Sequence, residues 1–148
     1  MLRTSTWFSF QPPPDWGESN EGGRIVYRSP AGEALIISSF AAAGHGSKDE
    51  EESVRERLLQ NAFSSAIAAA SQPDLQVKRK LAPDSRVTGV EAWTWESETI
   101  DGVEIFFQTV FRSGMGVMLV TFEAYNSPTA KLAYEIFVKS VKKAEPTV

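Results

Sequence analysis

Apolar and polar residues alternate in short runs along most of the chain, and proline or glycine separates the runs. Successive side chains of a strand point to opposite faces, so a period of two predicts strands. The first predicted strand must end near Gln11, because Pro12, Pro13 and Pro14 have no amide hydrogen to donate. Trp16 is expected to seal the sheet after this turn. The predicted strands cover residues 6–10, 25–27, 34–40, 75–81, 90–97, 103–112 and 116–125.

Short loops between these strands predict antiparallel pairs. Pro30-Ala31-Gly32 joins the second and third strands in a hairpin. Asp101-Gly102 is a strong hairpin signal because both residues tolerate positive φ, so the last three strands form a meander. Lys78-Arg79-Lys80 lies in the fourth strand, where lysine is typical of an edge strand protected against further pairing.

In two segments the apolar residues recur at the spacing of a helix instead of alternating. Ser47 and Glu50 fit a capping box, after which apolar residues recur at helical spacing through Ser71. Ser127 and Pro128 begin a second helix. Its predicted inner stripe comprises Leu132, Ala133, Ile136, Phe137, Ser140 and Val141. The order of elements predicts one α+β domain over residues 1–148, a largely antiparallel sheet of about six or seven strands with two main helices packed on it.

The predicted strand of residues 103–112 has two unlike faces. The face predicted to join the core carries Val103, Ile105, Phe107, Thr109 and Phe111, and the other, mixed face carries Glu104, Phe106, Gln108, Val110 and Arg112. Trp93 and Trp95 alternate on the neighbouring strand, so both project from one side of it. Tryptophans usually belong to the core, but they are also enriched at interface hot spots. If the mixed face lies on their side, the partner-binding candidates are Trp93, Trp95, Phe106, Gln108 and Val110.

Composition narrows the classes of function. The 148 residues are 42% hydrophobic and 23% charged, as in ordinary globular domains, and the lack of cysteine excludes disulfides and thiolate metal sites. No window approaches the ~18 apolar residues of a membrane span. The net charge of −4 disfavours binding to nucleic acid or anionic membranes. The first residues lack the apolar core of a signal peptide, so we expect a cytoplasmic protein.

The residues offer little recognisable chemistry. His45 is the only histidine and lies two residues before Ser47, so one alternative is a small-molecule-binding protein or hydrolase with a cleft there and His45 as general base. A solvated loop histidine beside a capping serine is the simpler interpretation. The carboxylates of residues 49–52 point in different directions from one helical turn, so they cannot converge on one metal ion. Their negative charges are instead stabilised by the helix dipole at the first turn. We therefore expect no catalytic residues, no cofactor and no metal site.

Several features taken together resemble a known family. They are a strand ending in Phe-x-x-Pro (Phe10 to Pro13), then Pro14-Asp15-Trp16, a strand pair begun by glycine, a long helix, a three-stranded meander with an Asp101-Gly102 turn, and a last helix containing Ile136-Phe137-Val138-Lys139-Ser140-Val141. In this order they are similar to bacterial members of the PsbP-like superfamily, which also includes the Ran-binding nuclear import factors. The resemblance implies a sheet with helices and a habit of binding proteins, as in photosystem assembly, nuclear import and the chaperones of type VI secretion effectors.

The leading hypothesis is a non-enzymatic bacterial protein-binding module, such as a toxin immunity protein or a secretion effector chaperone or adaptor. Its expected partner is another protein, a toxin or a secreted effector, rather than nucleic acid or a membrane. The hydrolase or small-molecule binder is the alternative, and a homodimer formed through an exposed sheet face is the third.

Overall fold

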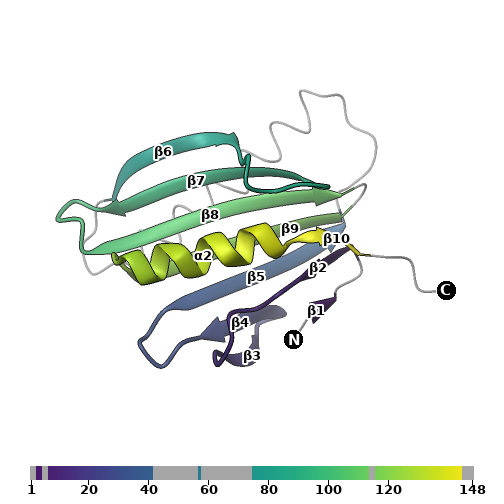
Figure 1. Ribbon diagram of the computed structural model, residues 1–148, viewed down its shortest axis with the longest axis horizontal. Helices are drawn as coiled ribbons and strands as arrows, with labels where there is room; N and C mark the ends of the chain where they lie inside the picture. Colours follow the sequence, from purple (N-terminus) through teal and green to yellow (C-terminus); the bar gives the residue numbers. More distant parts are fainter. Residues whose placement is uncertain (1–2, 5–6, 42–56, 58–74, 114–115, 145–148) are drawn as a thin grey trace.

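Seven strands form the main sheet in a computed structural model, which describes residues 3–4, 7–41, 57, 75–113 and 116–144. All neighbouring strands are antiparallel, in the order β3-β4-β5-β9-β8-β7-β6 (Figure 1). This confirms the predicted α+β class and the meander. The strands are β3 Gly17–Glu21, β4 Arg24–Arg28, β5 Ala34–Ala41, β6 Leu75–Pro83, β7 Glu91–Thr99, β8 Glu104–Ser113 and β9 Gly116–Tyr125.

A small three-stranded sheet joins the two ends of the chain. It contains β1 (Arg3–Thr4), β2 (Phe8–Phe10) and β10 (Lys142–Lys143), with β2 in the middle. The backbone of Gln11 then donates to Ser140 Oγ at 2.9 Å instead of continuing a ladder. β2 therefore ends where the three prolines predict.

The pattern of apolar residues missed β3. Its sequence, Gly-Glu-Ser-Asn-Glu, is polar at every position, and four of its five residues are exposed. Pairing with β4 is set instead by the turn, where Gly22 and Gly23 have φ of 62° and 80°. Such a turn needs the conformational freedom of glycine.

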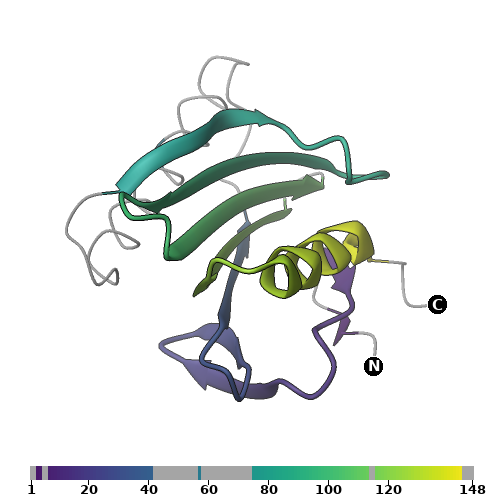
Figure 2. The same cartoon turned by 60° about the vertical axis from the view of Figure 1, so that its left-hand side comes forward.

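Helix α2 (Pro128–Ser140) lies across one face of the main sheet, with β2 beside it (Figures 1 and 2). Ser127 caps it by accepting a 3.0 Å hydrogen bond from the backbone of Ala130, as predicted. The predicted inner stripe is correct for Phe137 and Val141, which are buried, but wrong for two of its other residues. Leu132 and Ile136 are each 55% exposed, and the buried residues are Ala130, Tyr134, Phe137 and Val138.

Aromatic packing explains which side of α2 is buried. Tyr134 makes an edge contact with Phe107 at 5.2 Å between ring centroids, and Phe137 does the same with Phe10 at 5.6 Å. These large rings bury more apolar surface than leucine and isoleucine would in their place. On the same face of the sheet, Phe122 contacts Tyr134, and Trp16 stacks on Phe122 at 6.2 Å. Trp16 is thus packed against the core after the proline turn, in agreement with its predicted sealing role.

Two further predictions concern a second helix and the core face of β8. The helix expected from Ser47 to Ser71 lies outside the described residues apart from Arg57, so α2 is the one helix of substantial length that the structure describes. Val103 was expected on the core face of β8, but it precedes the strand and is 50% exposed, whereas Ile105 and Phe111 are buried as predicted. Within the described ranges, no helix is long and apolar enough to cross a membrane.

Candidate functional site

The two tryptophans of β7 and the mixed face of β8 lie on the same side of the sheet. Trp93 is directly opposite Val110, and Trp95 is opposite Gln108. The alternate residue Thr109 contacts Tyr134 of α2, so these pairs occupy the face away from that helix. The condition on which the partner-binding candidates were chosen, that the mixed face of β8 lies on the side of the two tryptophans, is therefore met.

These residues differ in exposure. Phe106, Gln108 and Val110 are only 3%, 0% and 3% exposed, whereas Trp93 and Trp95 are half-buried. The β8 side chains are thus packed inside the chain and do not present a surface in this conformation. A partner-binding role for the five residues stays a prediction, with the two tryptophans as the accessible part.

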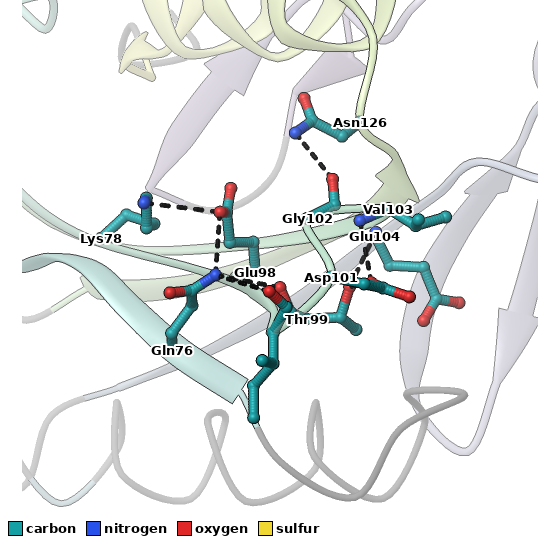
Figure 3. Close-up of polar contacts among 10 residues, drawn as sticks. Gln76, Lys78, Glu98, Thr99, Asp101, Gly102, Val103, Glu104 and Asn126 are labelled. Atoms are coloured by element: carbon teal, nitrogen blue, oxygen red, sulfur yellow. Dashed lines mark hydrogen bonds and ion pairs between the residues drawn. The ribbon is translucent and has the colours of Figure 1, made fainter.

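The β7–β8 hairpin ends in a turn that is braced by many hydrogen bonds (Figure 3). The Asp101 carboxylate accepts from Thr99 Oγ1 at 2.7 Å and from the backbone of Val103 at 3.1 Å. These bonds, led by the one from Thr99, lower the pKa of Asp101 below its usual value. The Gly102 amide donates to Thr99 O at 2.8 Å, and Gly102 has a φ of 74°. Of the Asp101-Gly102 pair, the glycine alone uses the positive φ that the sequence suggested for both.

Neighbouring strands hold this turn from two sides (Figure 3). Asn126, just after β9, donates from its side chain to Gly102 O at 2.9 Å and from its backbone to Val103 O at 2.8 Å. On the other side, Gln76 of β6 donates to the carbonyls of Thr99 and Ile100, each at 3.2 Å. The backbone of the hairpin is therefore ordered before any partner arrives.

Three large apolar side chains are exposed at this end of the sheet. Ile100 is 61% exposed, Val103 50% and Tyr125 64%. We call Ile100, Val103 and Tyr125 the tip surface; Tyr125 belongs to it because it pairs with Glu104, the residue after Val103. Single exposed apolar residues are common, but an apolar group on a rigid, exposed turn is typical of an interaction site.

A buried polar network joins β7 and β8 to α2 on the opposite face. Asp84 accepts from Arg86 Nε at 2.9 Å and Nη2 at 2.7 Å, and from Thr94 Oγ1 at 2.5 Å. Thr94 contacts Thr109 at 3.0 Å, and Thr109 contacts the Tyr134 hydroxyl. We call this chain of Asp84, Arg86, Thr94, Thr109 and Tyr134 the Asp84 network.

The Asp84 network has the electrostatics of a structural clamp. Burial raises the pKa of Asp84, but hydrogen bonds from Arg86 and Thr94 outweigh it and lower the pKa to about 2. Burial also raises the pKa of Tyr134, so its hydroxyl stays protonated and available as a hydrogen-bond donor. Arg86 lies 5.8 Å from the centre of the Tyr134 ring, a favourable cation–π arrangement. Every charge is matched, which suits holding α2 on the sheet.

Other predicted features have a mixed outcome. His45, Ser47 and the carboxylates of residues 49–52 lie outside the described residues. The strand that carries Lys78-Arg79-Lys80 does lie at a sheet edge, and two register shifts interrupt its pairing with β7. In the part of the chain that the structure describes, no group of three or more histidine, cysteine, aspartate or glutamate side chains could hold a metal ion.

The sequence interpretation overlooked the tip surface. The signal was present: Ile100 and Val103 flank Asp101-Gly102, so they belong to the turn and not to the alternating strands. An apolar residue in a turn has no core to enter, which marks it as exposed. Tyr125 ends β9 just before the Asn126-Ser127 cap and could have been assigned in the same way.

The strand order, the crossing helix and the sealed amino-terminal strand define a PsbP-like fold. The structure is similar to the solution structure of cyanobacterial PsbP (CyanoP) from Synechocystis, with a TM-score of 0.65 and 15% identity over 97% of this chain and 92% of that one. It is also similar to LpqN, described as involved in cell envelope biogenesis of Mycobacterium tuberculosis, with a TM-score of 0.50 and 14% identity over 93% of this chain and 83% of that one. No family model matches the sequence, and no curated protein does. The likeness is one of fold.

Proposed function

We propose that this protein is a non-enzymatic protein-binding module whose partner docks on the tip surface. The observation that carries the proposal is the exposure of Ile100, Val103 and Tyr125 on a turn whose backbone is already held by Asp101 and Asn126. Ordering a loop during association costs binding free energy, and a braced turn avoids that cost. Tyrosine is among the residues most enriched where an interface concentrates its binding free energy, and Tyr125 lies beside the two aliphatic side chains.

The biological setting belongs to the same proposal. A cytoplasmic bacterial protein that binds a toxin as its immunity protein, or a secreted effector as its chaperone or adaptor, would use such a surface. Trp93 and Trp95 offer a second, half-buried contact area on the face away from α2. The second helix expected over residues 47–71 completes the fold that we propose.

The experiment compares two pairs of exposed apolar residues. The tip variant carries Ile100→Gln and Val103→Gln, and the control variant carries Leu132→Gln and Ile136→Gln on α2, where exposure is similar. Each tagged protein captures partners from the native host at near-native expression. The captured proteins are identified, purified and titrated against both variants. We expect the tip variant to bind about tenfold more weakly or worse, since loss of a hot-spot side chain costs more than ~1 kcal/mol, and the control to bind normally.

The outcomes separate the alternatives. Equal binding of the tip variant and the wild type to every identified partner would remove the tip surface from the proposal. If sedimentation shows a concentration-dependent dimer that only the tip variant abolishes, the occupant is a second copy of the chain and the heterologous partner is refuted. Correctly dispersed NMR spectra of both variants ensure that neither result reflects misfolding.

A further inference from the structure

A small pocket opens beside the tip surface, on the face away from α2. Its volume is about 240 Å³, below the usual range of pockets for whole small molecules, so it suits one side chain. Three elements that meet at this end of the sheet supply its walls: the β4–β5 turn, β8 and β9. It is lined by Ala31, Gly32, Glu104, Phe106, Glu123, Ala124 and Tyr125.

One wall of this pocket carries a carboxylate without a direct partner. Glu123 is half-buried, and its side chain makes no hydrogen bond or ion pair to any residue in the described ranges. Burial raises the pKa of Glu123; the charges of Arg28 and Arg24 oppose that rise, and Glu104 adds to it. Withdrawing a carboxylate from water without a partner costs free energy, which a cation in the pocket would offset.

Arg28, the arginine with the larger influence on the pKa of Glu123, does not occupy this pocket as its direct partner. Both terminal nitrogens of Arg28 bond to the carboxylate of Glu21 on the neighbouring strand, and Arg28 itself is exposed. The Glu21 pKa falls to about 2, mainly through the bond from Arg28. Arg28 is therefore committed to another carboxylate, and its influence on Glu123 acts through space only.

We propose that this pocket accepts an arginine or lysine side chain of the protein partner, with Glu123 as its counter-ion, next to the apolar contacts of the tip surface. The inference rests on the proposed function, because it specifies the chemistry of that same docking site. Tyr125 is 64% exposed at the rim, where its ring can face the cation, and Phe106 supplies apolar wall for the methylene stem. Guanidinium suits the site best, because it pairs with a carboxylate through two parallel hydrogen bonds.

The test uses a side-chain mimic, so it does not require the partner. Protein of residues 1–148, labelled with ¹³C and ¹⁵N, is titrated with N-acetyl-arginine amide, with the neutral isostere N-acetyl-citrulline amide, and separately with magnesium chloride, and amide NMR shifts are recorded. Glu123→Gln removes the proposed counter-ion. Glu135→Gln removes a partly exposed carboxylate that pairs with Lys139 on α2, and it is the control for the change in net charge. We expect saturable shifts at residues 31–32 and 123–125 with the arginine compound, and about tenfold weaker binding of citrulline.

The variants and a second readout decide the result. Glu123→Gln should reduce binding of the arginine compound to the citrulline level, and Glu135→Gln should not change it. In the wild type, saturation with the arginine compound should lower the pKa of the Glu123 carboxyl, which carbon NMR reports without any substitution. Equal shifts with citrulline, full binding to Glu123→Gln, an unchanged Glu123 pKa, or magnesium binding tighter than the arginine compound would each overturn the inference.

The two proposals fail separately. If the arginine compound does not bind at Glu123 while the Ile100→Gln and Val103→Gln variant still loses its partner, the tip surface stands and the cation pocket falls. If the compound binds at Glu123 but the tip variant retains every partner, docking on the tip surface falls.

Discussion

Asp84→Asn removes the charge at the centre of the Asp84 network while keeping the shape of the side chain. Asp84 is 7% exposed, and its pKa falls from an ordinary value of 3.8 to about 2 in the folded protein. By linkage, the lower pKa corresponds to about 2.5 kcal/mol of stability from the ionised form near neutral pH. Asparagine can still accept from Thr94 but leaves the Arg86 charge without its counter-ion. We expect the variant to lose about 2–3 kcal/mol of unfolding free energy at about pH 7.

The pH dependence distinguishes this cause from simple loss of packing. A depressed pKa contributes stability that is complete above the unfolded value of 3.8 and is lost as the pH falls through about 2. The contribution of Asp84 should therefore shrink to about 1.3 kcal/mol near pH 3 and to less than about 0.5 kcal/mol near pH 2. The stability gap between the wild type and Asp84→Asn should close accordingly.

Urea unfolding, followed by tryptophan fluorescence at several pH values, measures that gap. Glu91→Gln removes an exposed carboxylate at the first residue of β7, so it controls for a general change in net charge. A gap below about 0.5 kcal/mol near neutral pH, or one that stays constant down to about pH 3, would refute the reasoning. The first result would mean that the charge is not stabilising, and the second that it acts through packing alone.

Three further substitutions test the packing. Tyr134→Phe removes the hydroxyl that contacts Thr109 and should cost about 1–2 kcal/mol in urea unfolding; a neutral effect would show that this end of the network is unimportant. Gly116→Ala would push a methyl group into the side chain of Trp7, so we expect a loss of about 1–3 kcal/mol, and unchanged stability would contradict that close approach. Ser127→Ala removes the cap of α2 and should lower stability by about 1 kcal/mol in thermal melts, a prediction that an unaltered melting temperature would exclude.

Much of the sheet could be predicted because its strands alternate clearly. Phe107 and Thr109 have the same parity along β8, and both contact Tyr134 of α2, as the period of two requires. Burial does not separate the two faces of this strand, because residues of both parities are buried. The residues that begin and end elements were equally reliable signals. Ser127 caps the start of α2, and β2 ends just before the three prolines that follow Gln11. These features depend on a few neighbouring residues, so local reasoning is sufficient for them.

Features that depend on distant contacts could not be predicted in this way. β3 carries no apolar alternation and forms only because β4 lies next to it. The phase of α2 was ambiguous because Leu132 and Ile136 compete with Tyr134 for the inner positions. Tyrosine gains that position through a hydrogen-bond partner for its hydroxyl, Thr109, which lies 25 residues away in the sequence. Aromatic packing and this hydrogen bond, both with partners distant in the sequence, therefore together set a phase that the local pattern of hydrophobic residues left open.

The physical cause of exposure also distinguishes the surface proposed to bind a partner from the exposed apolar residues of α2. Leu132 and Ile136 are exposed because larger rings took the buried side of α2, so their position follows from core packing and requires no function. Ile100 and Val103 are exposed on a turn whose own polar contacts, centred on Asp101, hold it outside the core. Keeping apolar side chains in water on a rigid support is unfavourable for the isolated protein and useful for association. The α2 variant therefore tests apolar residues that are exposed as a result of core packing, and the tip variant tests apolar residues that a braced turn holds in water. Loss of a partner by the α2 variant alone would reverse the assignment of the binding surface to the turn.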